Sequence, residues 1–396
     1  MTRKALIIGG GIAGAATAIF LRRAGYAAEM FESRPQAGDL GGGLQVAPNG
    51  MHVMAELGLA DAVREAGSCS TGMRFYAQGG GYLGAINRNM ETRFGAPAIN
   101  IRRGALQDIL LDEAVRSGAG LHFGKRLTSV DDVPGCPVVA RFADGETAEG
   151  DILIGADGVH SAVRTWLFPE GPHPFDTGLV GFGGFVPRAL LDAAGVGQDM
   201  HMTFGRSGFF GYGICGGPNG GDAMWWSTQP ETGVDASTFR AMGPRAIKDH
   251  LLAFHDGWHA PIPQLIDAAQ EFVVTDTLDV ATLPLWHRRR VLLIGDAAHA
   301  TSPHAGQGAS LALEDASRLG KLIARHGGNT DVAFAHFENE RRGRTERVVA
   351  LARQNGNSKR EFSATGAFVR DQMMRLLLPL FASRQNWMYA YDARTI

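Results

Sequence analysis

The chain begins with short apolar runs separated by glycine turns. An apolar run covers residues 4–8, a longer stretch of small and apolar residues covers 12–24, and another short run covers 27–32. Short continuous apolar runs are typical of buried strands, whereas a run of a dozen residues favours a helix. The order therefore predicts a βαβ unit at the start of the chain.

Similar apolar runs and glycine-rich turns occur at several later points in the chain. A glycine-rich loop at 41–43 precedes a predicted helix that carries Met51, Met54 and Leu57, and an amphipathic pattern predicts a helix over 103–117. A buried strand is predicted at 151–155, and another at 291–295 is followed by a helix at 308–325. Apolar runs typical of buried parallel strands occur both before and after a long stretch with a different pattern. We therefore expect the first lobe to be discontinuous in sequence.

Between these parts the pattern changes to short runs rich in glycine and aromatic residues. We expect antiparallel strands of a second lobe at 181–186, 201–204, 209–214 and 224–226. The predicted division is an α/β lobe formed by 1–178 and 276–350, an inserted β-sheet lobe at 179–275, and a C-terminal helical segment at 351–396.

Composition excludes several classes of protein. The net charge is −2 with charges spread evenly, so no basic face for nucleic acid or an anionic membrane is expected. Three isolated cysteines favour neither disulfides nor a thiolate metal site, which fits a cytoplasmic protein. The apolar start superficially resembles a signal peptide, but glycines lie in its middle. The apolar stretch 373–381 is too short to span a bilayer and is interrupted by Pro379.

A dinucleotide-binding turn lies between the first strand and the first helix. Gly9, Gly11 and Gly14 have the G-x-G-x-x-G spacing that permits a tight turn, close approach of the backbone to a pyrophosphate, and packing of helix on strand. Glu32 follows 18 residues after Gly14, near where an acid binds the ribose hydroxyls. A Rossmann-like fold is therefore predicted, but this turn does not distinguish FAD from NAD.

Later motifs resemble one known family. Residues 155–164 (GADGVHSAVR) resemble the Asp-Gly fingerprint of the para-hydroxybenzoate hydroxylase family, the single-component group A flavin monooxygenases. Residues 295–299 (GDAAH), continuing through 303–308 (PHAGQG) to 314–316 (EDA), are similar to that family's second FAD motif, and 103–107 (RGALQ) matches its Arg-x-x-Leu helix start. The matches follow the family's order, and the tail around 387–392 is also similar. Salicylate hydroxylases, 6-hydroxynicotinate hydroxylases and tetracycline-oxidising enzymes are the members it resembles most.

The resemblance implies a glutathione-reductase-type FAD-binding lobe and a set of cofactor contacts. Asp296 would bind the ribityl chain, Arg103 would reach FAD while Arg102 points elsewhere, and Asp157 would organise the fingerprint loop, which the family also links to NAD(P)H. The amides at the start of the helix after Gly306 would face the pyrimidine edge of the flavin. The full predicted set comprises Gly9, Gly11, Ile12, Ala13, Gly14, Glu32, Ser33, Arg34, Gly43, Leu44, Arg103, Gln107, Asp157, Gly295, Asp296, Pro303, Gly306, Gln307, Gly308, Ala309 and Ser310.

The family's chemistry also defines the expected function. Its members use NADPH or NADH as a transient reductant and dioxygen, and hydroxylate small aromatic, heteroaromatic or polycyclic substrates through a flavin hydroperoxide. A second, complete nucleotide-binding unit is not visible in the sequence. A flavin reductase or dehydrogenase without oxygen insertion, and a non-catalytic FAD-binding protein, remain alternatives. A flavin halogenase is disfavoured because residues 225–230 (WWSTQP) do not match the halogenase Trp-x-Trp-x-Ile-Pro signature.

The substrate pocket is expected between the flavin ring and the second lobe. Tyr212 is the predicted polar contact to the substrate, and Gln45 lies where the similar hydroxylases carry pocket residues. Candidate walls are Phe182, Phe185, Phe204, Phe210, Tyr212 and Trp226, and alternation alone does not say which of them face inward. No candidate for a dedicated base is apparent. His250, His255 and His259 lack partners at metal-ligand spacing, so no metal is expected.

Overall fold

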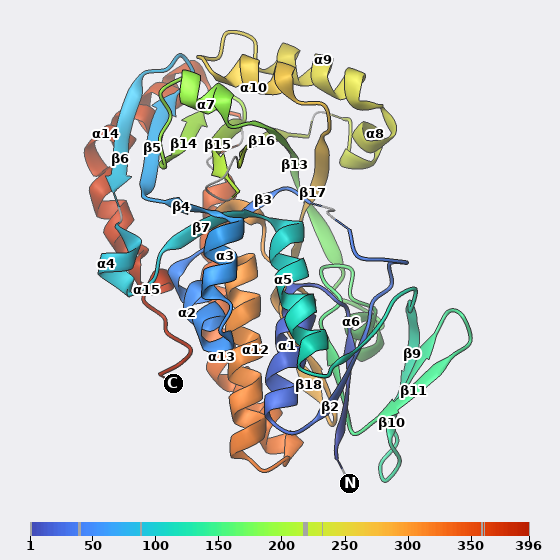
Figure 1. Cartoon of the computed structure of the whole chain (residues 1–396). Coiled ribbons are helices and arrows are strands. Elements are labelled where there is room, and N and C mark those ends of the chain that lie inside the picture. The colour runs from blue at the N-terminus through green and yellow to red at the C-terminus, as the bar shows by residue number, and fades with distance from the viewer. Residues whose placement is uncertain are drawn as a thin grey trace.

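The computed structural model describes residues 2–38, 41–87, 89–216, 221–231, 233–357, 359 and 361–395. Its first lobe is built on a six-stranded sheet with helices on one face (Figure 1). The strand order is β18 (His287–Arg288), β19 (Val291–Leu293), β12 (Ile152–Gly155), β1 (Lys4–Ile8), β2 (Ala27–Phe31) and β8 (Gly120–His122). All neighbours pair in parallel except β18 and β19.

The centre of this sheet is completely buried, as its apolar sequence predicted. In β1, Ile7 pairs with Ile154 of β12 on one side and with Met30 of β2 on the other. Strands buried on both faces need continuous apolar sequence. The helices of this lobe are α1 (Ile12–Arg23), α2 (Pro48–Leu57), α3 (Ala60–Ala66), α5 (Arg103–Arg116), α6 (Ala162–Leu167), α11 (Asp296–His299), α12 (Gly308–Arg325) and α13 (Thr330–Asn357).

Two small sheets extend the first lobe. One projects from it as β9 (Leu127–Asp131), β10 (Val138–Phe142) and β11 (Thr147–Gly150). The other lies towards the second lobe as β3 (Gly43–Val46), β7 (Ala98–Arg102) and β4 (Ser68–Ser70). In β3 and β7, Gln45 pairs with Asn100, which brings two amide side chains together at the boundary between the lobes.

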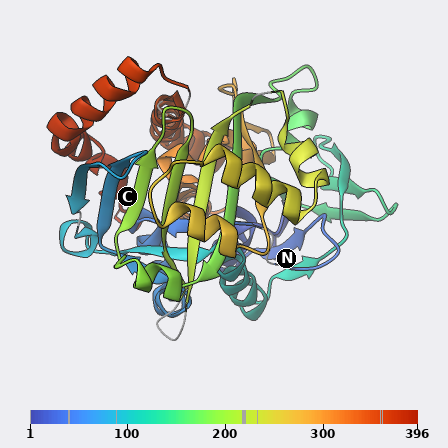
Figure 2. The same ribbon diagram turned by 90° about the horizontal axis from the view of Figure 1, so that it is seen from above.

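The second lobe is a seven-stranded sheet covered on its outer face by helices (Figure 2). Its order is β17 (Val273–Val280), β13 (Pro174–Pro187), β16 (Asp222–Pro230), β15 (Phe209–Cys215), β14 (Met200–Phe204), β5 (Gly72–Ala77) and β6 (Tyr82–Asn87). The covering helices are α7 (Ala189–Ala193), α8 (Ala236–Ala241), α9 (Pro244–Phe254) and α10 (Ile262–Ala268).

The α/β class, the discontinuous first lobe and the inserted antiparallel strands predicted from the sequence are confirmed. The strands of the second sheet cross the predicted bounds of the division: β13 begins at Pro174, before 179, and β17 ends at Val280, after 275. Strands β5 and β6 belong to the second sheet although residues 72–87 lie in the first predicted segment. The parallel pairing of β5 with β14 joins segments more than 100 residues apart in sequence, which local periodicity does not reveal, and β6 then pairs with β5.

The chain ends in a helical segment beside β6 (Figure 1). It contains α14 (Ala364–Arg384) and α15 (Asn386–Tyr389), while α4 (Met90–Phe94) and a 3-10 turn at Pro303–Ala305 complete the helices. Phe368 and Leu376 on α14 are exposed. None of the helices within the described residues combines the length and the apolar composition that crossing a bilayer requires.

Candidate functional site

The three glycines of the first turn have two different physical roles. A Cβ on Gly9, whose φ is +105°, would overlap the carbonyl of Ala156, and a Cβ on Gly14 would overlap the carbonyl of Gly9. A Cβ on Gly11 would meet no atom within 4 Å. Gly9 and Gly14 are therefore required by packing within the protein. Gly11 instead faces open space at the start of α1, where no side chain caps the helix.

Two side chains hold the backbone of this turn in place. The Gly10 amide donates to Glu32 Oε2 at 2.8 Å, and Gln107 Nε2 donates to the Gly10 carbonyl at 2.8 Å. The second oxygen of Glu32 accepts from the Arg34 amide at 2.9 Å. Glu32 thus lies at the end of β2 with its carboxylate beside the turn, as the sequence predicted for an acid that binds ribose.

Arg103 lies between the two halves of the predicted cofactor site. Its backbone amide donates to Gly42 at 3.2 Å at the start of α5. Burial lowers the pKa of Arg103, as does the positive charge of Arg34, while Asp296 and Glu32 act in the opposite direction. The Arg103 guanidinium therefore interacts electrostatically with both carboxylates, Asp296 and Glu32. Arg102 points away, to Asp222 and the ring of Phe185 on the second sheet.

Asp157 organises the loop after β12. Its carboxylate accepts from the Ser161 hydroxyl at 2.5 Å, from the Ala162 amide at 2.8 Å and from the Val163 amide at 3.1 Å. Burial raises the pKa of Asp157, and these hydrogen bonds oppose that rise. The structure therefore gives this carboxylate a capping role at the start of α6, which corresponds to the organising role inferred from the sequence.

The second motif meets the first turn at Gly295. A Cβ on Gly295, whose φ is +56°, would lie 3.1 Å from the Cβ of Ala13. The next residue, Asp296, begins α11 and is exposed. Even so, the surrounding protein excludes enough water to raise the pKa of Asp296, while His299 and Arg103 act to lower it. An accessible carboxylate enclosed by protein on several sides is typical of a ligand cleft.

The loop after Asp296 leads to a helix start that no side chain caps. Gly306 adopts a φ of +60°, and α12 begins at Gly308 without a side-chain hydrogen bond to its first amides. Those amides and the helix dipole attract negative charge. Pro303 and Gly306, on the same loop, are exposed.

At two predicted cofactor contacts the side chains point into the protein. Gln307 is buried and its Oε1 accepts from Asn49 Nδ2 at 2.9 Å. The Ser310 hydroxyl is fully buried and accepts from the Ala47 amide at 3.2 Å. Both side chains bind the start of α2 to α12, so only backbone groups at these two positions remain candidates for cofactor contact.

The remaining predicted contacts surround the same space. Ile12 is buried, Ala13, Leu44, Gly308 and Ala309 are half-buried, and Gly43 and Ser33 are exposed. Gly43 also lies against Met224 of the second sheet, since a Cβ there would overlap the Met224 side chain. The first lobe therefore touches the second sheet at β3.

A buried ionic network beneath the second motif was missed from the sequence. Asp315 accepts from the Gly295 amide at 2.9 Å and is paired with His299 at 2.6 Å. Arg341 is fully buried and pairs with Asp315 at 2.7 Å and with Glu314 at 2.6 Å. The Glu-Asp pair was part of the recognised motif, but nothing in the sequence linked it to an arginine 26 residues further on.

The inner face of the second sheet, turned towards the first lobe, is lined by methionines and aromatic rings. We call these residues the inner face: Met73, Phe75, Phe185, Met200, Met202, Phe204, Phe209, Met224 and Trp226. Along β15, Phe209 belongs to this face, whereas the next residue, Phe210, stacks on Trp225 under the helices. Of the predicted walls, Phe185, Phe204 and Trp226 are on the inner face, and Phe182, Phe210 and Tyr212 are on the outer face.

Tyr212 is not placed for substrate contact, which corrects the sequence prediction. Its side chain is 1% exposed in the core under the outer helices, and its hydroxyl is 3.1 Å from His201 Nδ1. Burial raises the pKa of Tyr212 and lowers that of His201 to about 4. The pair is therefore a neutral, hydrogen-bonded element of the outer core, and we do not retain Tyr212 as a substrate contact.

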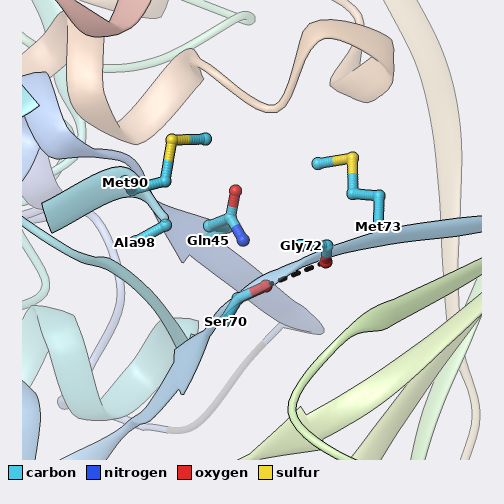
Figure 3. Close-up of a pocket in the computed structure, with 6 residues that line it drawn as sticks. All are labelled: Gln45, Ser70, Gly72, Met73, Met90 and Ala98. Carbon is cyan, nitrogen blue, oxygen red and sulfur yellow. Dashed lines mark hydrogen bonds between the residues drawn. The ribbon is translucent and has the colours of Figure 1, made fainter. Parts of the chain in front are cut away.

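Gln45 lies beside the inner face. Its Nε2 donates to Asn100 Oδ1 at 3.0 Å and is 3.8 Å from Met200 Sδ. The amide of Gln45 lies between the side chains of Met90 and Met73 in a small pocket that Ser70, Gly72 and Ala98 complete (Figure 3). Polar groups in a mainly apolar pocket are suited to orienting a small molecule.

The residues of the first lobe fit FAD. The open face of Gly11, the uncapped starts of α1 and α12, and the accessible carboxylate of Asp296 lie along one route that Arg103 spans. Anionic phosphates suit the first helix start and Arg103, and ribityl or ribose hydroxyls suit the two carboxylates. Among the described residues, no three His, Cys, Asp or Glu side chains cluster so that they could hold a metal ion.

Comparison with known proteins agrees with this fit. The FAD binding domain family matches residues 2–352. The chain is 33% identical over 386 residues to the aurachin C monooxygenase/isomerase of Stigmatella aurantiaca, covering 94% of each chain. It is also 31% identical to the 6-hydroxynicotinate 3-monooxygenase of Pseudomonas fluorescens, covering 88% of this chain and 90% of that one.

A solved structure extends the similarity to the whole fold. The crystal structure of Klebsiella pneumoniae HpxO complexed with FAD and uric acid superposes with a TM-score of 0.87 at 26% identity, covering 98% of this chain and 97% of that one. The family match and the monooxygenase relatives thus extend over nearly the whole length of the chain. The protein belongs to the FAD binding domain family and is an FAD-dependent monooxygenase.

Proposed function

We propose that this enzyme uses NADPH or NADH and dioxygen to hydroxylate a small aromatic or heteroaromatic substrate held against the inner face. The observation that carries the proposal is the position of this methionine- and aromatic-rich face opposite the cofactor loops. Flat, polarisable rings pack well on methionine sulfur and on aromatic side chains. The names of relatives, which include hydroxylases of 6-hydroxynicotinate, 3-hydroxybenzoate and urate, point to the same class of substrate.

In this proposal the protein positions the reactants and excludes water. Bound FAD would supply the redox chemistry, namely hydride acceptance from NAD(P)H and activation of dioxygen. The amides at the start of α12 would stabilise negative charge on a bound cofactor, because they are fixed in orientation before the reaction. The apolar inner face removes water from around the substrate, which strengthens such electrostatic interactions.

Gln45 and Asn100 are the side chains we assign to orienting the substrate at one end of the inner face. Asn100 donates to the Ile214 carbonyl at 3.1 Å and accepts from Gln45, so its own groups are fixed. Gln45 retains its carbonyl oxygen as an acceptor, which Figure 3 shows among the pocket side chains. A substrate N–H or O–H would satisfy that acceptor.

The proposal is tested on the purified FAD-bound protein. Oxidation of NADH and of NADPH would be followed with a panel of aromatic acids, phenols and nitrogen heterocycles, with product mass measured in parallel. We expect at least one compound to stimulate oxidation and to gain one oxygen atom derived from dioxygen. Stimulated oxidation that proceeds equally without dioxygen would instead indicate a dehydrogenase. No stimulation by any compound would indicate a non-catalytic flavoprotein.

Two neighbouring phenylalanines give a matched test of which face binds the substrate. Phe209→Ala on the inner face is expected to raise KM, by about tenfold for a loss of about 1.4 kcal/mol of contact. Phe210→Ala on the outer face is expected to lower the free energy of unfolding by about 3–5 kcal/mol, since it empties a fully buried site. KM of the folded Phe210→Ala enzyme should stay unchanged. If KM rose in Phe210→Ala and stayed unchanged in Phe209→Ala, the substrate would bind the outer face and the proposal would be wrong.

A further inference from the structure

Lys359 is a buried lysine at the junction of the two lobes. It lies in the connection between α13 and α14 and is only 8% exposed. Its Nζ is 4.0 Å from the centre of the Phe209 ring and 3.0 Å from His304 Nδ1. Phe209 belongs to the inner face and His304 to the loop that leads to α12, so one ammonium group touches both walls of the proposed substrate site.

No carboxylate is paired with Lys359 in the described part of the chain. Among the described residues, none of the ion pairs includes Lys359, and its two contacts are a neutral ring and an imidazole. Burial lowers the pKa of Lys359 to about 7. A buried cation without an anion is costly, and a bound anion would restore the balance.

His304 is the polar side chain that holds Lys359 in place. Burial, and after it the charge of Lys359, lower the pKa of His304 to about 2, so the ring is neutral. When Lys359 donates to Nδ1, the ring proton is on Nε2. Nε2 is buried and has no hydrogen-bond partner among the described residues. Nε2 lies on the side of the ring away from Lys359, next to Gly356 of α13, where a Cβ would come within 3.3 Å of it.

We propose that Lys359 is a specificity-determining residue that selects substrates carrying an anionic oxygen, either carboxylate or phenolate, at the end of the inner face opposite Gln45. Met200, beside Gln45, begins β14, and Phe204, paired with Phe209 below Lys359, ends it. The inference rests on the proposed function, because it takes the inner face as the substrate wall. It adds the charge of the substrate and the residue that recognises it.

The test compares ligand pairs of similar shape and different charge. Equilibrium dialysis of the FAD-bound protein near neutral pH would measure Kd for benzoate against benzamide, and for 2,4-dinitrophenolate against 2,4-dinitroanisole. The two pairs distinguish a carboxylate from a phenolate. Variants are Lys359→Met, Lys359→Gln as a polar alternative, Lys359→Arg to retain the charge, and Lys248→Met as a control on the outer helix α9.

We expect the two uncharged variants of Lys359 to bind the anionic member of each pair more weakly, while their affinity for the neutral member stays the same. In Lys359→Met and Lys359→Gln, the ratio of anion affinity to neutral affinity should fall about tenfold or more, as for loss of a charge-assisted contact of about 1.4 kcal/mol or more. Lys359→Arg should keep the preference, and Lys248→Met should change nothing.

Equal loss of both members of a pair, an unchanged ratio, or no binding to the unmodified enzyme would overturn the inference. Failure of the proposed function would give a different experimental result, because dialysis measures binding and does not depend on turnover. An enzyme that prefers anions through Lys359 but shows no stimulated NAD(P)H oxidation would refute the hydroxylase proposal alone.

Discussion

Replacing Arg341 with methionine is expected to lower the free energy of unfolding by about 3–5 kcal/mol, because buried carboxylates lose their positively charged partner. Arg341 and both of its partners, Glu314 and Asp315, are 0% exposed at their side chains. Glu314 would keep Arg344 at 2.7 Å, but Asp315 would lose its only arginine partner among the described residues and keep the hydrogen bond to His299. Urea unfolding of the variant and the unmodified protein measures the difference.

The loss should extend to the cofactor site. Asp315 accepts from the Gly295 amide, and Gly295 immediately precedes the exposed Asp296. A shift of Asp315 therefore moves the residue proposed to hold the ribityl chain. We expect FAD affinity of Arg341→Met, measured by flavin fluorescence on titration of the apoprotein, to fall together with stability.

An exposed arginine supplies the control. Arg245 pairs with Asp249 one helical turn away at 3.0 Å, with side chains 87% and 55% exposed. Arg245→Met should change the free energy of unfolding by less than about 0.5 kcal/mol, as is usual for surface pairs. If Arg341→Met were as mild as this control, the buried network would not have the structural role assigned to it.

Acid should reduce the effect of Arg341→Met. Burial by itself raises the pKa of Asp315, but His299 and Arg341 outweigh it and hold the pKa at about 2, below the ordinary 3.8. A carboxyl group with a lowered folded-state pKa stabilises the protein fully above the unfolded-state value and loses this contribution as pH falls towards the folded-state value. The difference in Tm between the two proteins should therefore narrow as pH falls from about 4 to about 2.

Alanine at Gly11 and at Gly14 should impair FAD binding for different reasons. Gly14→Ala places a Cβ on the Gly9 carbonyl, so we expect the apoprotein itself to lose about 1–3 kcal/mol through overpacking. Gly11→Ala meets no protein atom, and its small capping loss is opposed by reduced entropy of the unfolded chain. Its apoprotein should stay within about 1 kcal/mol of the unmodified one, while FAD Kd rises at least about tenfold because the pyrophosphate approaches there.

Thermal unfolding of the apoproteins and FAD titration separate these two causes. Gly343→Ala on the exposed face of α13 is the matched control, since a Cβ there also meets open space. It should bind FAD normally and gain about 0.5–1 kcal/mol from better helix propensity. If Gly11→Ala bound FAD as well as Gly343→Ala does, the pyrophosphate would not lie at this turn.

The first lobe could be predicted well because its signals are local. The turn at Gly9–Gly14 depends on a few consecutive residues, and each required glycine has a contact or a φ that explains it. The ends of α12 were predicted exactly, since its apolar stripe and the preceding glycines define them. Motif resemblance also singled out Asp157, which caps the start of α6, and Asp296, which begins α11 and is exposed.

The side-chain roles were predicted less well where both faces of an element are covered. Strand β15 alternates Phe209, Phe210, Gly211 and Tyr212, and both of its faces are apolar, so the pattern gives no sign of which face meets the cofactor. Tyr212 was therefore placed on the wrong face. Ser310 and Gln307 lie at a helix start that suits FAD, but their side chains bond to α2, more than 250 residues earlier.

By itself, the sequence determined the α/β lobe, its glycine turn, the acid at Glu32 and the family, because these depend on short-range geometry that few residue combinations satisfy. The tertiary structure alone decided which aromatic residues form the substrate wall, which arginine neutralises Asp315, and that Lys359 meets Phe209 and His304. Those contacts join segments far apart in the chain, and the burial and charge that give them their energy exist only once the chain is folded.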